Sequence, residues 1–388
     1  MTGPRARCIF FRRILETYEH FAENLAILTA QSKRGDMMKH LSWLLVCSVC
    51  LPTLAFSDTD QQRMGGHGLA LPATFSGTLP CADCPGIEYH LDIWDGQQGY
   101  ALRRSYLERD LVIDEVGRWH VDPARNALIL EGTGNARSEW QITPNQEIRL
   151  LDQEGQPIES DLPYTLVSGP LAPTDLRLTV TGLMTYFADA ALFTECLTGQ
   201  RFPIAMEEDY LALERAYLAA EIVPGAPLLA HLDAEISMRP QMEGADRMTV
   251  TVTQFHHITP DAGCPDHRMP AEFENTYWGL THLQGVEQDQ SNERQEPYLL
   301  ILEEGTRFGG TIGCNRLMGQ VTREGASVEF GPTASTMMAC PDDLAEKEAA
   351  FANALSMTRG LDLMDQSLRL LDETGVELAR FNALYTRY

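Results

Sequence analysis

The sequence predicts an all-β protein with a minor helical component, arranged as three small β-barrel domains in tandem. From Thr74 onward, short stretches of alternating apolar and polar residues are separated by Gly, Pro, Asn and Asp turn signals, as in hairpin-linked strands. Two segments show a helical pattern, and the cysteines after residue 57 fall into three pairs, one for each domain. With 388 residues, 44% of them apolar, the chain can give each domain a core.

Residues 1–57 are predicted to be an upstream extension followed by a signal peptide. A basic stretch precedes the apolar run 41–56, which is shorter than the roughly 20 residues that a membrane span needs. Small residues lie one and three positions before Asp58, so a signal peptidase can cleave there. We therefore expect export to the periplasm, with the true start of translation at Met37 or Met38.

The mature chain, 58–388, is predicted to be soluble and strongly acidic. Cys47 and Cys50 each follow a valine where a lipobox needs a small residue, so there is no good lipidation site. Residues 1–57 hold seven of the 30 Lys and Arg and four of the 55 Asp and Glu, which leaves a net charge near −28 for the remainder. Such a charge repels nucleic acid and anionic membrane surfaces, and we expect no membrane span in the mature chain.

The cysteine count of the mature chain indicates disulfide bonds. Six cysteines remain after residue 57, an even number in an oxidising compartment. They allow 15 pairings. One bridge per domain is the simplest arrangement, and it joins Cys81 to Cys84, Cys196 to Cys264 and Cys314 to Cys340.

The first domain, 71–168, is predicted to follow a flexible tail, because residues 58–70 are polar, Gly-rich and without apolar periodicity. Alternating stretches separated by turns predict a small antiparallel, lipocalin-like barrel; they are 89–94, 99–106, 117–121, 127–130 and 147–151. Pro163 and the Pro-rich run 168–174 cannot continue a central strand, so they mark the end of the domain.

The second and third domains, 171–268 and 271–388, each combine strands with one helix. The second has a helical Leu/Tyr stripe over 209–220 and strands at 176–182, 228–236 and 248–255, which suit a five-stranded OB-like barrel. In the third, Pro341 precedes a helix over 342–355 with acidic residues in its first turn. Its predicted strands are 276–280, 298–302, 308–312, 328–330 and 368–371.

Three sets of motifs resemble known families. Residues 75–86, Phe-Ser-Gly-Thr-Leu-Pro-Cys-Ala-Asp-Cys-Pro-Gly, resemble the opening of the NlpE family of envelope lipoproteins, which is tied to copper tolerance and the Cpx stress response. Residues 182–205 and the helix at 213–218 resemble the OB-like second domain of that family. The third domain is similar to META domains such as HslJ, through Thr276–Leu280, Gly309–Arg316 and Thr336–Pro341.

The resemblances span about residues 71–385 and imply a periplasmic sensor or adaptor for envelope stress or copper. Such a protein is not an enzyme, and it acts through contacts with an envelope protein partner, either a stress sensor or a cell-envelope component. The chain departs from the lipoprotein family in its missing lipobox, and a mechanism that depends on a mislocalised lipid anchor requires that motif.

Cys81 and Cys84 form the main candidate site. Their spacing suits a Cu(I) ion, a redox-active disulfide or a structural bridge, and the sequence leaves these alternatives open. Prolines flank the pair between short strands, whereas a thioredoxin-type oxidoreductase would place it before a helix. A thiol oxidoreductase is therefore the less favoured reading, and copper is the single candidate cofactor.

Other potential donors lack a diagnostic spacing. Met64, His67, His90 and His120 lie in the same part of the chain as the cysteine pair. A second group comprises His256, His257, Cys264 and His267, but adjacent residues on a strand point to opposite faces and should not chelate together. The sequence contains no nucleophile elbow, zinc-protease helix or phosphate-binding loop. The alternative function is a passive binding module, with a small apolar or lipid-like ligand in a barrel or an inter-domain groove.

Overall fold

The computed structural model describes residues 62–387, apart from 97, 134–135, 188–189, 242–243, 266–268 and 289–294. These residues fall within one compact unit, Asp58–Tyr388. The predicted extension and signal peptide, 1–57, lie outside the described residues. In the part described, no helix has the length and apolar character to cross a membrane. The prediction of a mostly β protein is confirmed, since strands dominate the described residues and the helices there are α2 and α3.

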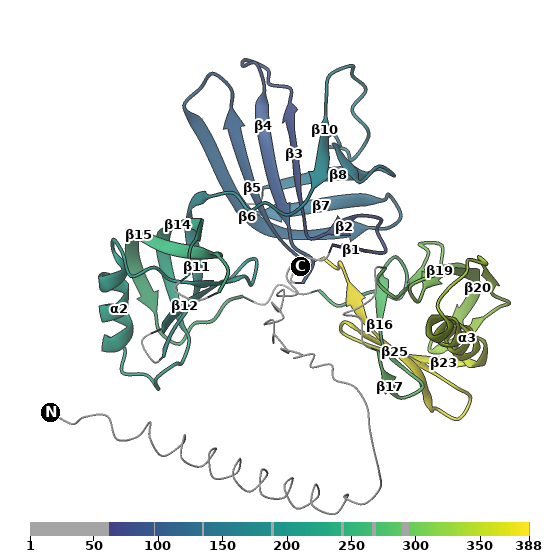
Figure 1. Ribbon diagram of the computed structural model, residues 1–388. Coiled ribbons are helices and arrows are strands. Elements are labelled where there is room, and N and C mark those ends of the chain that lie inside the picture. Colours follow the sequence, from purple (N-terminus) through teal and green to yellow (C-terminus); the bar gives the residue numbers. More distant parts are fainter. Residues whose placement is uncertain are drawn as a thin grey trace, which may run out of the picture. The chain divides into compact units, whose positions relative to one another are not determined.

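The first domain is a closed antiparallel barrel, drawn in purple and blue in Figure 1. Its strands are joined in the order β10-β3-β4-β5-β6-β7-β8-β9. Aromatic side chains fill its core, where Phe75, Tyr100, Trp119 and Trp140 are almost fully buried. The strands are β3 (Ala73–Leu79), β4 (Ile87–Ile93), β5 (Gly99–Tyr106), β6 (Leu111–Asp122), β7 (Ala127–Gly132), β8 (Arg137–Ile142), β9 (Glu147–Leu150) and β10 (Thr165–Gly169).

The prediction of a flexible tail is wrong for residues 62–70. Together with Leu71 they form a strap, 62–71, in which β1 (Arg63–Met64) pairs with β2 (Ala70–Leu71). Leu69 is fully buried in the barrel core. The Gly-rich composition permits close packing here, because a Cβ atom on Gly66 would lie only 2.7 Å from the ring of Tyr277.

The second domain has a five-stranded sheet in the order β13-β12-β11-β14-β15. A single bridge between Ile204 and Val250 brings the two ends of this sheet together. Helix α2 (Tyr210–Ala219) begins and ends close to the predicted bounds and buries Tyr210, Leu213 and Tyr217. The strands are β11 (Leu176–Phe187), β12 (Ala190–Glu195), β13 (Arg201–Pro203), β14 (Leu228–Arg239) and β15 (Arg247–Thr259).

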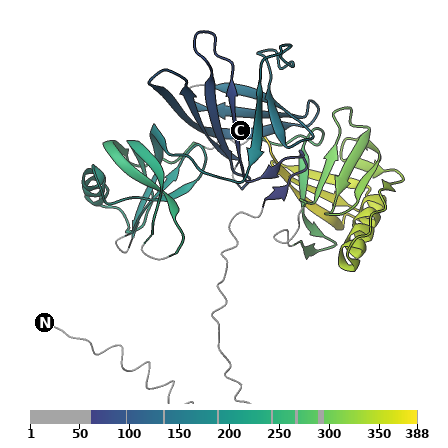
Figure 2. The same ribbon diagram turned by 45° about the horizontal axis from the view of Figure 1, so that its top comes forward.

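The third domain is also closed, because β25 pairs back onto β16. Helix α3 (Asp342–Met357) packs against the sheet, as Figure 2 shows, and contributes Phe351 and Leu355 to the core. The strands are β16 (Tyr277–Leu283), β17 (Val286–Glu287), β18 (Tyr298–Ile301), β19 (Arg307–Thr311), β20 (Arg316–Glu324), β21 (Ser327–Phe330), β22 (Ala334–Ser335), β23 (Gly360–Met364), β24 (Ser367–Leu371) and β25 (Glu377–Leu384).

The linker between the first two domains is hydrogen-bonded to the outside of the barrel. The backbone N–H of Ala172 donates to Thr74 Oγ1 at 2.8 Å, and the N–H of Thr174 donates to Asp92 Oδ2 at 3.1 Å. Asp92 is 1% exposed and also accepts a hydrogen bond from Thr74 Oγ1 at 2.5 Å. His90 Nε2 lies 3.3 Å from Asp92 Oδ1, and this hydrogen bond raises the pKa of His90. Asp92 therefore fixes the start of the second domain.

Replacing Asp92 with alanine is expected to lower the free energy of unfolding by about 3 kcal/mol, because a buried acceptor of several hydrogen bonds is lost. Urea denaturation measures this change, and hydrogen exchange at the Thr174 amide should become faster. Asp92→Asn is the matched control, since it keeps an acceptor oxygen and should lose less. Unchanged exchange at Thr174 in Asp92→Ala would show that this bond does not hold the linker.

Candidate functional site

The Cys81–Cys84 pair lies in the loop between β3 and β4. The two residues are joined by a disulfide, with their Cα atoms 5.2 Å apart, and both are partly exposed. Asp83 between them is 73% exposed, and its carboxylate forms an ion pair with Arg109 at 2.8 Å. Arg109 also donates to the backbone oxygen of Asp83 at 2.6 Å. The bridge is thus accessible and connected to the turn between β5 and β6.

The donor atoms around this pair fit a soft metal only when the cysteines are reduced. Sγ of Cys81, Sγ of Cys84 and a carboxylate oxygen of Asp83 lie within 4.8 Å of one another. Two thiolates would suit Cu(I), whereas the sulfur atoms of a disulfide carry no thiolate charge. In the part of the chain described, this cluster does not include the other candidate donors, Met64, His67, His90 and His120.

The other two bridges join distant parts of their domains. Cys196 is bonded to Cys264 and Cys314 to Cys340, with sequence separations of 68 and 26. Beside the latter, the backbone N–H and the side-chain amide of Asn315 donate to the buried Glu348 at 2.5 and 2.8 Å. Asn315 Oδ1 accepts the N–H of Met338 at 2.8 Å. This network accounts for Asn315 as a structural residue.

The expectation that His256 and His257 point to opposite faces is wrong. The β14–β15 register shifts between His231 and Leu232, so His256 is an extra residue in a β-bulge. As a result His257 stacks on His231, with ring centroids 4.3 Å apart, and His256 Nε2 lies 3.2 Å from Asp233 Oδ1. Both contacts are on the same face of β14. His267 lies outside the described residues.

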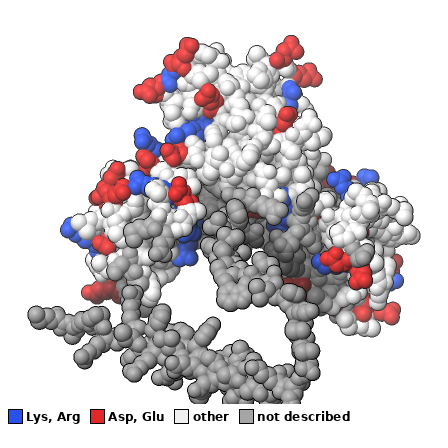
Figure 3. Space-filling view, viewed as in Figure 1, with Lys and Arg blue, Asp and Glu red and all other residues white. Residues whose placement is uncertain are grey.

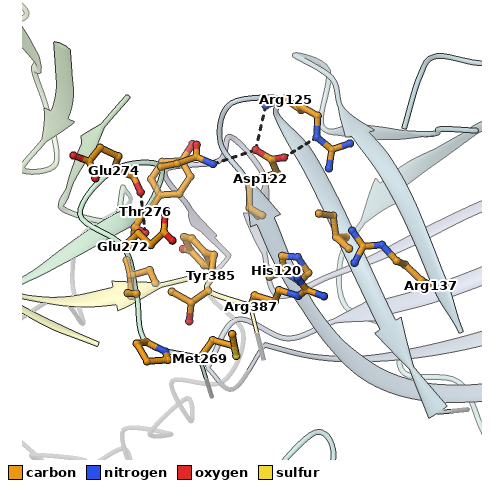
Figure 4. A pocket seen from close by; sticks show the side chains of 18 residues that line it. His120, Asp122, Arg125, Arg137, Met269, Glu272, Glu274, Thr276, Tyr385 and Arg387 are labelled. Carbon is orange, nitrogen blue, oxygen red and sulfur yellow. Dashed lines mark hydrogen bonds and ion pairs between the residues drawn. The ribbon is translucent and has the colours of Figure 1, made fainter. Parts of the chain in front are cut away.

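A groove of about 480 Å³ lies between the barrel and the segments flanking the third domain (Figure 4). Its walls carry both acidic and basic side chains, and the arginines among them pair with carboxylates in or beside the groove. Arg125 contacts Asp122 and Glu139, each at 2.6 Å, and Arg137 contacts Glu131 at 2.7 Å. The groove is therefore polar and electrostatically balanced, which does not favour an apolar ligand.

Two buried histidines lie at this junction. His120 lines the groove, and burial together with the charges of Arg137 and Arg387 lowers its pKa to about 4. His67 in the strap is more deeply enclosed, and burial lowers its pKa to about 3. The N–H of Leu69 donates to His67 Nδ1 at 3.1 Å, while His67 Nε2 is buried without a hydrogen-bond partner. From the sequence, both residues were candidate metal donors, and nothing in the pattern around them indicated that they are buried.

Two aromatic residues from distant parts of the chain contact His67. Its ring makes edge contacts with Trp119 of β6, at 5.7 Å between centroids, and with Tyr385, at 4.5 Å. The Tyr385 hydroxyl donates to Glu296, whose pKa is raised by burial. The backbone N–H of Glu296 donates to the backbone oxygen of Met64, in the strap, at 3.0 Å. The strap thus connects the first domain to the third.

Known families match all three domains. The NlpE N-terminal domain matches residues 75–161, the NlpE C-terminal OB domain matches 177–265, and the META domain matches 271–384. Three solved structures are also similar in sequence, with TM-scores of only 0.23 to 0.25. The Cpx pathway activator NlpE from Escherichia coli is 28% identical, and the match covers 50% of this chain and 100% of that one. A putative lipoprotein from Shewanella oneidensis is 27% identical, with 26% of this chain and 89% of that one covered. A protein from Burkholderia xenovorans is 25% identical, with 33% of this chain and 98% of that one covered.

A curated relative matches about half of this chain. Lipoprotein NlpE of Escherichia coli strain K12 is 34% identical over 190 residues, which is 47% of this chain and 75% of that protein. The identity extends over most of the relative, and the two NlpE domains follow each other in the same chain. The predicted resemblance is therefore confirmed, and the chain belongs to the NlpE family, with a META domain added after the two NlpE domains.

Proposed function

We propose that this protein is a non-enzymatic sensor or adaptor of the bacterial envelope, which reports the state of the Cys81–Cys84 pair through contacts with another envelope protein. The observation that carries this proposal is the accessible bridge itself, in a loop connected by Arg109 to a neighbouring hairpin. Family membership supports it, because the relative from Escherichia coli is named a lipoprotein and its solved structure is described as a Cpx pathway activator.

The chemistry of such a sensor is a reversible two-electron step. A dithiol reductant transfers two electrons and two protons to the bridge, its own thiols become a disulfide, and Cys81 and Cys84 are released as thiols. Loss of the two protons gives thiolates that can bind Cu(I). Cys81 and Cys84 would hold the ion, and Asp83 would contribute negative charge beside it. Copper or reductant would therefore change the same loop.

Two other functions have less support from the geometry. A thiol oxidoreductase normally places its cysteine pair at a helix N-terminus, whereas the element after this pair is strand β4. A passive carrier of apolar ligands would need an open apolar cavity, but aromatic side chains fill the barrel core and the groove beside it is charged. We place the protein in the periplasm; the sequence favours a soluble form, and the name of the relative favours a lipid anchor.

The first experiment is a Cu(I) titration of the reduced mature protein. We expect tight binding that is lost in the Cys81→Ser/Cys84→Ser variant, because the two thiolates of this partly exposed loop offer a soft two-coordinate site. Reduction also frees Cys314 and Cys340, which lie beside Glu348, so Cys314→Ser/Cys340→Ser is tested as well and should bind as the wild type does. Cys196→Ser/Cys264→Ser is the control and should bind as the wild type does. Mass spectrometry assigns the oxidised cysteines before reduction. If the wild type binds no Cu(I) and cells carrying the Ser/Ser variant respond normally to copper and reductant, the proposed sensing site is wrong.

A further inference from the structure

One edge of strand β6 carries no partner strand near its beginning. β6 pairs with β5 from Leu111 onward, but its pairing with β7 starts only at Gly117. Among the described residues, no other strand pairs with the outer edge of Leu111–Val116. The second domain approaches this stretch at Asp114, whose carboxylate accepts the N–H of Arg177 at 2.7 Å. The part left open is therefore Leu111–Ile113, which we call the open edge.

The open edge consists of three consecutive exposed apolar residues. Leu111, Val112 and Ile113 are 42%, 52% and 36% exposed. Successive side chains of a strand point to opposite faces, so β6 presents apolar side chains on both of its faces here. An apolar strand with an unpaired edge is a template for pairing with another chain, and proteins normally protect such edges with charges, prolines or bulges. None of these devices interrupts Leu111–Ile113.

The hairpin that bears the open edge is connected to the disulfide loop at two points. Arg109, in the turn between β5 and β6, contacts both the carboxylate and the backbone oxygen of Asp83. The backbone N–H of Leu107 donates to the oxygen of Gly86 at 3.0 Å. Both Asp83 and Gly86 belong to the loop that the Cys81–Cys84 bridge constrains. A change in the bridge therefore acts on the position of the hairpin.

The surroundings of the open edge are acidic. Glu108 and Asp110 are exposed in the turn, while the nearby arginines, Arg103, Arg104 and Arg109, are all paired with carboxylates. On the face shown in Figure 3, acidic side chains predominate at the upper end of the barrel. A partner that binds here must bring positive charge as well as apolar residues.

We propose that the open edge of β6 binds an extended segment of another envelope protein, in which apolar residues alternate with basic ones, by strand addition, and that the Cys81–Cys84 bridge controls this binding. Backbone hydrogen bonds supply the pairing, and the alternating side chains meet the apolar and acidic groups of the hairpin. The intact bridge holds the hairpin ready to pair, whereas reduction loosens the loop and weakens binding. The control by the bridge rests on the proposed sensor function; the docking edge does not.

A short capped peptide of alternating valine and lysine is the probe, added to the oxidised full-length mature protein. We expect it to bind, and Val112→Asp to weaken the binding about tenfold or more. Val167→Asp is the matched control, because Val167 is 54% exposed but its strand is paired on both sides. Circular dichroism confirms that both variants are folded. Equal binding by wild type and Val112→Asp would overturn the docking edge and leave the copper experiment as a separate test of the sensor.

Reduction, or Cys81→Ser/Cys84→Ser, should weaken peptide binding about fivefold or more. Arg109→Gln should bind as weakly as the reduced protein in both redox states, because it removes the contact with Asp83. Binding that depends on Val112 but is the same in both redox states would overturn control by the bridge. Sedimentation velocity tests whether the open edge pairs with a second copy of this chain instead. If the wild type is a dimer that binds no peptide, and Val112→Asp is a monomer, the edge is a dimer contact and the proposed partner is wrong.

Discussion

Acidification from pH 6.5 to about pH 4.5 is expected to lower the free energy of unfolding by about 2 kcal/mol through His67 alone. The pKa of this residue is 6.5 in the unfolded chain and about 3 in the folded protein, where burial disfavours the charged ring. Below pH 6.5 the unfolded state therefore binds a proton that the folded state does not. Stability from this group is complete above pH 6.5 and is lost as the pH falls toward 3.

Among the groups around His67, Glu296 acts against this effect. Trp119 has no titratable group, and the hydroxyl of Tyr385 donates to Glu296. The raised pKa of Glu296 acts in the opposite direction, because proton uptake by this carboxyl stabilises the folded state as the pH falls. The charge of Arg63 lowers the pKa values of Glu296 and Tyr385, whereas the charge of Asp95 raises them.

Urea denaturation of wild type and His67→Phe at several pH values measures the contribution of His67. The phenylalanine ring keeps the aromatic contacts and removes both the titration and the unpartnered Nε2, but it also removes the acceptor of the Leu69 N–H. One buried unpaired group replaces another, so the variant should be close to wild type in stability near neutral pH. It should also lose less stability on acidification. His120→Phe is the comparison variant, since it leaves the strap unchanged. If the free energy of unfolding depends on pH identically in wild type and His67→Phe, His67 is not the group responsible for the loss of stability.

Removing the Cys196–Cys264 bridge is expected to destabilise the second domain by about 4 kcal/mol. The bridge closes a loop of 68 positions, and the chain-entropy model relates this length to the disorder that the bridge removes from the unfolded chain. Urea denaturation of Cys196→Ser/Cys264→Ser, followed by a probe in the second domain, measures the loss.

The short bridge of the first domain provides the control. Cys81 and Cys84 are separated by three positions, so their replacement by serine should cost only about 2 kcal/mol on the same model. If the two double variants lose equal stability, loop length is not the origin of the effect. A larger loss for Cys196→Ser/Cys264→Ser would mean that reducing conditions loosen the second domain before the first.

The sequence was most informative where apolar alternation and turn signals agree. The stretch 99–106 became β5 with its predicted bounds, and the Leu/Tyr stripe near 209–220 became α2. Short strands without clear alternation were missed, among them β12 and β13 of the second domain. The bulge at His256 was missed as well, because an extra residue in one strand depends on the register of its neighbour.

For the candidate site too, the sequence identified some residues and missed others. Cys81 and Cys84 could be identified from their spacing, whereas the contact between Asp83 and Arg109 brings together residues 26 positions apart and depends on the tertiary fold. The strap was misread because glycine is typical both of flexible tails and of backbone that packs closely. Only the position of Tyr277, far along the chain, distinguishes these two cases for Gly66.

The strap also affects the order in which the chain can reach its final structure. Residues 62–71 are synthesised long before their partners Glu296 and Tyr385, which lie near the end of the given sequence. The contacts that join the strap to Glu296 and Tyr385 close a very long stretch of chain, so they cannot form until the third domain is present. The first described segment is therefore fixed in two stages: Leu69 can pack with the first barrel, whereas the contacts with Glu296 and Tyr385 form only after the third domain is present.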